Sequence, residues 1–223
     1  MKRIKLCNRK LPSYTKGEEI MNMVTHIAGG GLGILALLAG IFFSVLRADV
    51  YRTVSAIIYG AGMICLYAMS SIYHGLRPGM GKKVMQVLDH CTIYFLIAGT
   101  YTVIAISALR PLFPGLGWGM LAFQWTLTAI AVTLTAIDLK KYNAFSMICY
   151  VGMGWAIAAF IPQTIQALGY PGFMLLLSGG ISYTIGAILY GIGSKMHWMH
   201  SVFHVFVVLG SLLQFLSILL YCL

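Results

Sequence analysis

Two pairs of polar side chains stand four residues apart within apolar stretches of this sequence. Ser70 and His74 lie in the string SSIYH, and His200 and His204 lie in HSVFH. Residues four apart share one face of a helix, so each pair would direct two polar groups the same way. Between the pairs lies Asp89, the only acidic residue inside any apolar run. An Asp at the bilayer centre costs about 2.5–3.5 kcal/mol, and metal binding would offset this cost.

Three histidines and a carboxylate indicate metal chemistry. Three neutral imidazoles and a water molecule form a known catalytic zinc arrangement, although iron, copper and nickel also accept imidazole ligands. Asp89 is expected either to be a fourth ligand or to accept a hydrogen bond from water beside the metal. Ser70 is expected to orient that water or a substrate carbonyl. Zinc lowers the pKa of water to about 7, which would favour hydrolysis.

Each of these residues also has a structural interpretation. A single histidine in a membrane helix usually forms structural hydrogen bonds, and a single serine usually bonds back to its own helix. The joint occurrence of the two spacings with Asp89 favours the metal site. The remaining histidines, His26, His90 and His197, are expected to pack between helices or to support the ligands.

The composition identifies an integral membrane protein. Of 223 residues, 60% are hydrophobic and 9% are charged, whereas soluble domains carry about 25% charged residues. Apolar runs reach the length of membrane-spanning helices, and the alternating segments of an outer-membrane barrel are absent. The net charge of +10 arises from basic residues between these runs and near the N-terminus, a pattern typical of topology signals and anionic-lipid contacts rather than nucleic-acid binding. The fold class is therefore all-α.

Seven membrane spans are predicted, in a single bundle over residues 21–223 that follows a basic cytoplasmic segment at residues 1–20. Twelve Lys and Arg residues lie on one side of these spans and three on the other, which places the N-terminus in the cytoplasm and the C-terminus outside. Five dispersed cysteines indicate neither disulfides nor a cysteine zinc site. The expected spans are roughly Met23–Leu46, Val54–Leu76, Val84–Leu109, Leu116–Ile137, Phe145–Ile165, Phe173–Ile192 and Trp198–Leu223.

This topology places the candidate residues in one layer of the membrane. His74 ends an inward-running span, whereas Asp89, His200 and His204 lie near the start of outward-running spans. At the helical rise, these positions and Ser70 lie about 5–14 Å from the cytoplasmic helix ends. Residues distant in sequence are therefore expected to meet.

Four strings resemble one known family: SSIYH, LDHCTIYFLIAGTYT, GGISYTIGAILYG and HSVFHVFVVLGS. They are similar to the bacterial hemolysin III family, within the progestin and adipoQ receptor superfamily that includes the adiponectin receptors. The resemblance covers nearly all of the chain from Glu18 to Leu223. Its pattern is Ser-x3-His, an Asp in the next span and His-x3-His in the last.

All five positions of that pattern match. The resemblance implies a seven-helix bundle with zinc near its cytoplasmic face, held by His74, His200 and His204. It further implies that Asp89 holds water at the zinc and that Ser70 lines the site. Val103 departs from the family, since many relatives place proline after AGTYT, and this difference would affect a helix kink rather than the metal.

Three functions remain open at this point. The first is a zinc-dependent intramembrane hydrolase of a lipid amide or ester, such as a ceramide-like lipid. The second is a zinc-stabilised regulator or sensor of membrane lipid state or energetics. The third is cytolysis by pore formation, although the sequence shows neither a secretion signal nor an amphipathic hairpin. The expected location is a bacterial inner (plasma) membrane, with lipids as environment and candidate substrate, no nucleic-acid partner and no protein partner identified.

Overall fold

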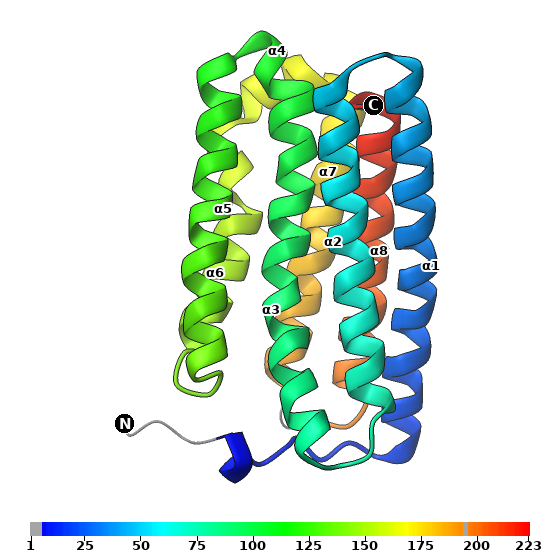
Figure 1. Ribbon diagram of the computed structural model, residues 1–223, viewed down its shortest axis with the longest axis vertical. Coiled ribbons are helices and arrows are strands. Elements are labelled where there is room, and N and C mark those ends of the chain that lie inside the picture. The colour runs from blue at the N-terminus through cyan, green and yellow to red at the C-terminus, as the bar shows by residue number, and fades with distance from the viewer. Residues whose placement is uncertain (1–5, 194–195) are drawn as a thin grey trace.

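The protein is a bundle of long helices that run side by side (Figure 1). The computed structural model describes residues 6–193 and 196–223, and no strand occurs in these two ranges, which confirms the predicted all-α class. The N-terminal segment and the C-terminus lie at opposite ends of the bundle. The helices are η1 (Leu6–Asn8), α1 (Lys16–Leu46), α2 (Val50–Gly75), α3 (Met80–Val103), η2 (Ile104–Leu109), α4 (Arg110–Leu112), α5 (Pro114–Ile137), α6 (Asn143–Gly154), η3 (Ala156–Phe160), α7 (Ile161–Gly193) and α8 (Met199–Tyr221).

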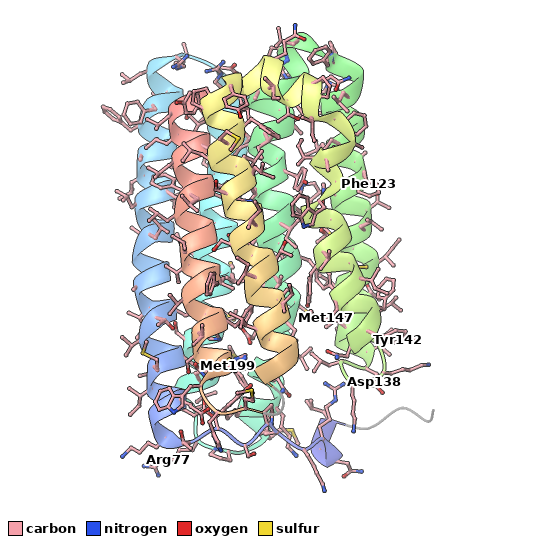
Figure 2. The ribbon with its side chains drawn as sticks, turned by 180° about the vertical axis from the view of Figure 1, so that it is seen from behind. Arg77, Phe123, Asp138, Tyr142, Met147 and Met199 are labelled. Carbon is pink, nitrogen blue, oxygen red and sulfur yellow. The ribbon has the colours of Figure 1, made fainter. Side chains whose placement is uncertain are left out.

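The outer surface of the bundle is apolar, as a membrane protein requires. Six helical stretches within the described residues are long and apolar enough to cross a bilayer. Large hydrophobic side chains are exposed along them, including Phe42 at 59% and Phe123 at 47%. Phe123 lies on the outer face in Figure 2. These side chains would face lipid, so the chain is a multi-pass membrane protein.

One of the six stretches, Asn143–Gly191, runs along the bundle twice. Its first part lies beside α3, where the Tyr101 hydroxyl donates to the Gly154 carbonyl at 2.7 Å. Its second part lies antiparallel to α8, where the Ser217 hydroxyl donates to the Gly172 carbonyl at 2.7 Å. The chain reverses between these parts.

The reversal is tighter than the loop expected between Ile165 and Phe173. Gly169 adopts a φ of 68°, a left-handed conformation that glycine adopts without steric cost. Pro171 follows in the first turn of the returning helix, where its missing N–H removes no helical hydrogen bond. A glycine and a proline therefore turn the chain between two helical passes.

The first helix also begins earlier than the expected Met23. Thr15 and Glu18 form a capping box, in which the Glu18 N–H donates to the Thr15 hydroxyl at 3.3 Å and the Thr15 N–H donates to the Glu18 carboxylate at 2.8 Å. The same carboxylate accepts from the Trp198 N–H at 2.7 Å. Glu18 thus starts α1 and attaches it to the start of α8.

The chain stays helical beyond Val103, where α3 ends, so no kink is seen at this position. The following residues, Ile104–Leu109, form a π-helical segment that is wholly buried. Within it, the Ser107 hydroxyl lies 2.8 Å from that of Ser55 in α2. The π-helical segment therefore belongs to the bundle core.

Close packing of α1 on α2 predicts a sharp dependence on one glycine. A Cβ at Gly60 would lie 2.6 Å from the Leu37 Cα, whereas a Cβ at Gly31 would meet nothing within 4 Å. We expect Gly60→Ala to destabilise the protein by about 1–3 kcal/mol because backbone must shift. Gly31→Ala should not destabilise it. Thermal unfolding in detergent would measure both, and equal midpoints for the two variants would contradict this packing.

Candidate metal centre

Three histidines from two helices meet inside one end of the bundle. His74 lies in the last turn of α2, and His200 and His204 lie in the first turns of α8. Their ring centroids are 4.6 to 5.4 Å apart, and one candidate ligand atom from each lies within 4.8 Å of the others. The structure therefore brings together all three predicted ligands.

Helix α1 fixes the orientation of two of the rings. The Glu19 carboxylate lies 2.7 Å from His74 Nδ1, and the Asn22 carbonyl lies 3.2 Å from His204 Nδ1. Such outer partners engage one ring nitrogen and leave the other for the metal. Accordingly, His74 Nε2 is buried without a hydrogen-bond partner among the described residues.

The remaining nitrogens suit a metal ion. The Nε2 atoms of His200 and His204 lie 3.1 Å apart. Zinc–nitrogen bonds of 2.0–2.1 Å in a tetrahedron place two ligand nitrogens about 3.3 Å apart. A cation would accept lone pairs from both atoms and from His74 Nε2, so the cluster can hold a metal. The nitrogen donors do not by themselves determine which metal binds.

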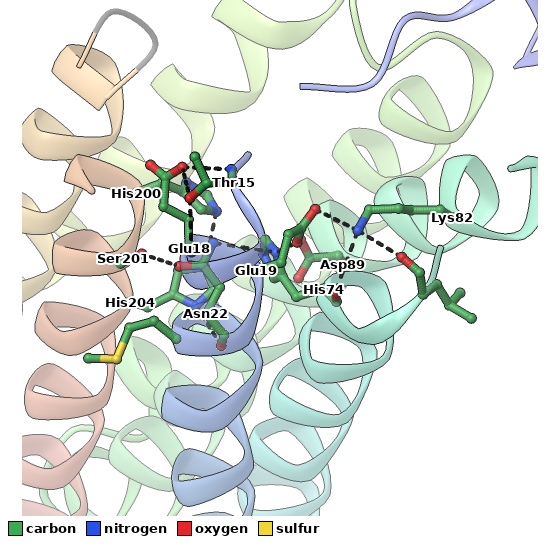
Figure 3. A network of polar contacts seen from close by, with 12 residues as sticks. Thr15, Glu18, Glu19, Asn22, His74, Lys82, Asp89, His200, Ser201 and His204 are labelled. Carbon is green, nitrogen blue, oxygen red and sulfur yellow. Dashed lines mark hydrogen bonds and ion pairs between the residues drawn. The ribbon is translucent and has the colours of Figure 1, made fainter. Parts of the chain in front are cut away.

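A polar network surrounds the histidines and was not predicted from the sequence (Figure 3). Lys82, expected in a cytoplasmic loop, is 3% exposed and donates to the Glu19 carboxylate at 2.7 Å and to the Leu76 carbonyl at 3.0 Å. The Ser201 hydroxyl donates to the Asn22 side-chain oxygen at 2.6 Å. Helices α1, α2, α3 and α8 are thereby joined around the cluster.

Ser70 and Asp89 lie on a cavity that His200 and His204 also line. Ser70 is completely buried, and its hydroxyl lies beside the Asp89 carboxylate and makes no hydrogen bond to a backbone carbonyl among the described residues. The expected alternative, a bond back to its own helix, is therefore not observed. The Asp89 carboxylate is 17% exposed and lies 3.9 Å from His90 Nδ1.

This cavity extends from the histidines into the bundle and has a volume of about 210 Å³. Most of its wall is apolar and comes from α3, α6, α7 and α8, with Leu96, Val151, Phe173 and Leu176 among the lining side chains. It thus joins a polar end, where Ser70 and Asp89 lie, to a long hydrophobic interior.

The other histidines differ in their surroundings. His26 stacks on His204, with centroids 3.7 Å apart, and both its ring nitrogens are buried without a partner among the residues described. His90 Nδ1 lies 2.8 Å from the Gln86 carbonyl one turn earlier. His197 has a 74% exposed side chain. His26 therefore packs between helices as expected, whereas the expectation of packing was wrong for His197, whose side chain is exposed.

One sequence pattern could have indicated the residues of α1 that contact the histidine cluster. Glu19, Asn22 and His26 follow the spacing i, i+3, i+7, which places all three on one face of α1. No sequence pattern indicated that Tyr14 contacts the cluster. Its ring stacks on His200 with centroids 4.9 Å apart, and burial raises its pKa above the usual value, which keeps the phenol neutral.

The fold and the site define a class, that of helical membrane proteins with a histidine cluster inside the bundle. The chain belongs to the haemolysin-III related family, whose model matches residues 14–215. It is 35% identical to Hemolysin-3 of Bacillus cereus, over 92% of each chain, and 34% identical to the Hemolysin-3 homolog of Bacillus subtilis (strain 168), over 94% of this chain and 96% of the other. It is 24% identical to the monocyte to macrophage differentiation factor of Homo sapiens, over 90% of this chain and 83% of that one.

Metal content should follow this geometry. We expect His204→Ala to abolish stoichiometric metal and Glu19→Gln to weaken metal affinity about 10–100-fold, because the carboxylate orients His74. His197→Ala is the matched control, since its side chain is exposed, and should bind as wild type does. Elemental mass spectrometry on detergent-purified protein measures all three. Full metal occupancy in His204→Ala would exclude this cluster as the site.

Proposed function

We propose that this protein is a zinc-dependent intramembrane hydrolase of a lipid amide or ester. One observation carries the proposal: His200 and His204 of the three-histidine cluster line one end of a cavity whose wall is mostly apolar. A polar head containing the scissile bond would lie at the histidines, and its hydrocarbon chain would occupy the apolar interior. Three imidazoles are a common set of ligands in catalytic zinc sites, which favours zinc over other metals.

The proposed roles of the chain's own residues follow from their positions. Zinc, when bound to His74, His200 and His204, supplies Lewis acidity that activates water and polarises a carbonyl. Asp89 is the carboxylate on the cavity wall and would accept a proton from the attacking water. The buried Ser70 hydroxyl, which lies beside Asp89, would donate a hydrogen bond to the substrate carbonyl or to that water. The apolar wall would exclude bulk water from the acyl chain.

We also propose that the chain crosses a bacterial plasma membrane seven times with its N-terminus in the cytoplasm. The two passes of Asn143–Gly191 support the count, because each lies along a different neighbouring helix. The twelve-to-three distribution of basic residues supports the orientation. The histidine cluster then lies near the cytoplasmic face. Residues 1–20 form the cytoplasmic segment and residues 21–223 the membrane domain.

A regulator of membrane state is the second candidate, and the polar network favours it. Glu19 links His74 in α2 to Lys82 in α3, and Asn22 links α1 to α8. Metal binding would therefore fix the relative positions of four helices. Unchanged lipid composition and membrane potential in a deletion strain under lipid stress would count against this role.

Cytolysis is the third candidate and rests on the names of the two Bacillus relatives. Metal-independent dye leakage from vesicles at a low protein-to-lipid ratio would support it over the hydrolase.

The hydrolase proposal predicts a separation between metal binding and turnover. Asp89→Asn and Ser70→Ala should retain zinc but lose most product formation, because neither residue is a proposed ligand. His197→Ala should keep full activity. The assay incubates purified protein with a panel of lipid amides and esters, with and without a chelator. Wild type that forms no zinc-dependent product, or Asp89→Asn that matches wild type, would refute the proposal.

The topology predicts the location of the C-terminus. Alkaline phosphatase, which is active only outside the cytoplasm, should be active when fused after Leu223 and inactive when fused after Ile137. Seven crossings with a cytoplasmic N-terminus require this result. If Asn143–Gly191 crosses only once, the fusion at Leu223 would be inactive.

A further inference from the structure

We propose a second site, separate from the histidine cavity, that binds an anionic phospholipid. It lies where the N-terminal segment meets the neighbouring ends of α3 and α5. Its elements are the Arg9 guanidinium, which would bind the lipid phosphate, and an adjacent apolar groove, which would hold the start of an acyl chain. The proposal does not depend on the hydrolase function.

Arg9 is buried but incompletely paired. The residue is 8% exposed, and its Nη2 atom lies 3.8 Å from the Asp138 carboxylate, beyond hydrogen-bond distance. Its Nε and Nη1 atoms are buried and have no hydrogen-bond partner among the described residues. Unmade hydrogen bonds from a buried charged group are costly. The guanidinium therefore has two donors without an acceptor among the described residues, and Arg9 lines the adjacent groove.

The groove beside Arg9 has a volume of about 220 Å³ and an otherwise apolar wall. Val84 and Leu88 come from α3, and Ile137 comes from the end of α5. These three side chains are 40%, 41% and 42% exposed, so the groove opens on the outer surface that faces lipid. Figure 2 shows Asp138 at the end of the bundle beside η1. The groove therefore lies at the level where headgroups meet acyl chains.

Two further contacts hold Arg9 in this position. Lys83 in α3 donates to the Cys7 carbonyl, and the Arg9 N–H donates to the Leu6 carbonyl at 3.2 Å. The segment is thereby attached to α3 on one side of the groove, while Asp138 attracts Arg9 on the other. The guanidinium does not need to be recruited from solution when a ligand binds.

Charge and shape together select the ligand. A guanidinium fork binds phosphate through two parallel hydrogen bonds, and the phosphate of phosphatidylglycerol carries a negative charge that no headgroup amine offsets. Basic pockets between helices at a cytoplasmic membrane surface commonly hold anionic headgroups. Free inorganic phosphate would pair with Arg9 but would leave the apolar groove without a ligand. A phospholipid supplies both a phosphate for Arg9 and an acyl chain for the groove.

Native mass spectrometry of the full chain, released from detergent with defined lipids, tests this site. Phosphatidylglycerol and phosphatidylcholine with identical acyl chains are compared at equal concentration. We expect preferential retention of phosphatidylglycerol by wild type, and a loss of about tenfold in Arg9→Gln, since charged hydrogen bonds are removed. Lys10→Gln removes an exposed positive charge next to Arg9 and should bind as wild type does.

A second variant separates lipid binding from folding. Val84→Trp fills the groove from a lipid-exposed position and keeps Arg9, so it should also weaken phosphatidylglycerol retention while metal content stays at the wild-type level. Equal retention of the two lipids by wild type, or unchanged retention in both Arg9→Gln and Val84→Trp, would overturn the proposal. Displacement of the lipid by millimolar inorganic phosphate would also overturn it, by identifying a site for the free anion.

Discussion

The contact between Glu19 and His74 is the interaction on which the rest of the site depends. It is 2.7 Å long, and the carboxylate also receives a hydrogen bond from the buried Lys82. Burying charged groups is favourable only when they are paired with good geometry. Because Glu19 is in α1, His74 in α2 and Lys82 in α3, this pairing fixes the positions of three helices and directs His74 Nε2 toward α8.

Helix α1 thus has a role beyond covering the bundle. Asn22 lies three residues after Glu19. Its backbone carbonyl contacts His204, and its side-chain oxygen accepts a hydrogen bond from the Ser201 hydroxyl. The capping box at Thr15 and Glu18 determines where α1 begins, and hence the rotation that places these groups toward the histidines. His200 and His204 also line the mostly apolar cavity. The histidine cluster therefore lies between the polar network around α1 and this cavity.

The sequence was sufficient to predict the features that arise from local geometry. The spacings of Ser70 to His74 and of His200 to His204 determine a helix face, and the three histidines meet as expected. The partners of the histidines could not be predicted in this way, since Glu19 and His74 are 55 residues apart and Asn22 and His204 are 182 apart. Lys82 was expected in a cytoplasmic loop, because a lysine near a helix start usually faces water, but its side chain is buried. The turn lies within the connection expected between Ile165 and Phe173, but its left-handed conformation at Gly169 could not be predicted, because hydropathy does not report backbone conformation.

The central claim is that three histidine nitrogens from α2 and α8 form one metal site. X-ray absorption spectroscopy at the zinc edge on purified wild-type protein tests it most directly, because the method reports the type and distance of the ligand atoms. The account predicts nitrogen or oxygen neighbours at about 2.0–2.1 Å with the outer-shell pattern of three imidazoles. Sulfur neighbours at about 2.3 Å, or a spectrum without imidazole scattering, would contradict it.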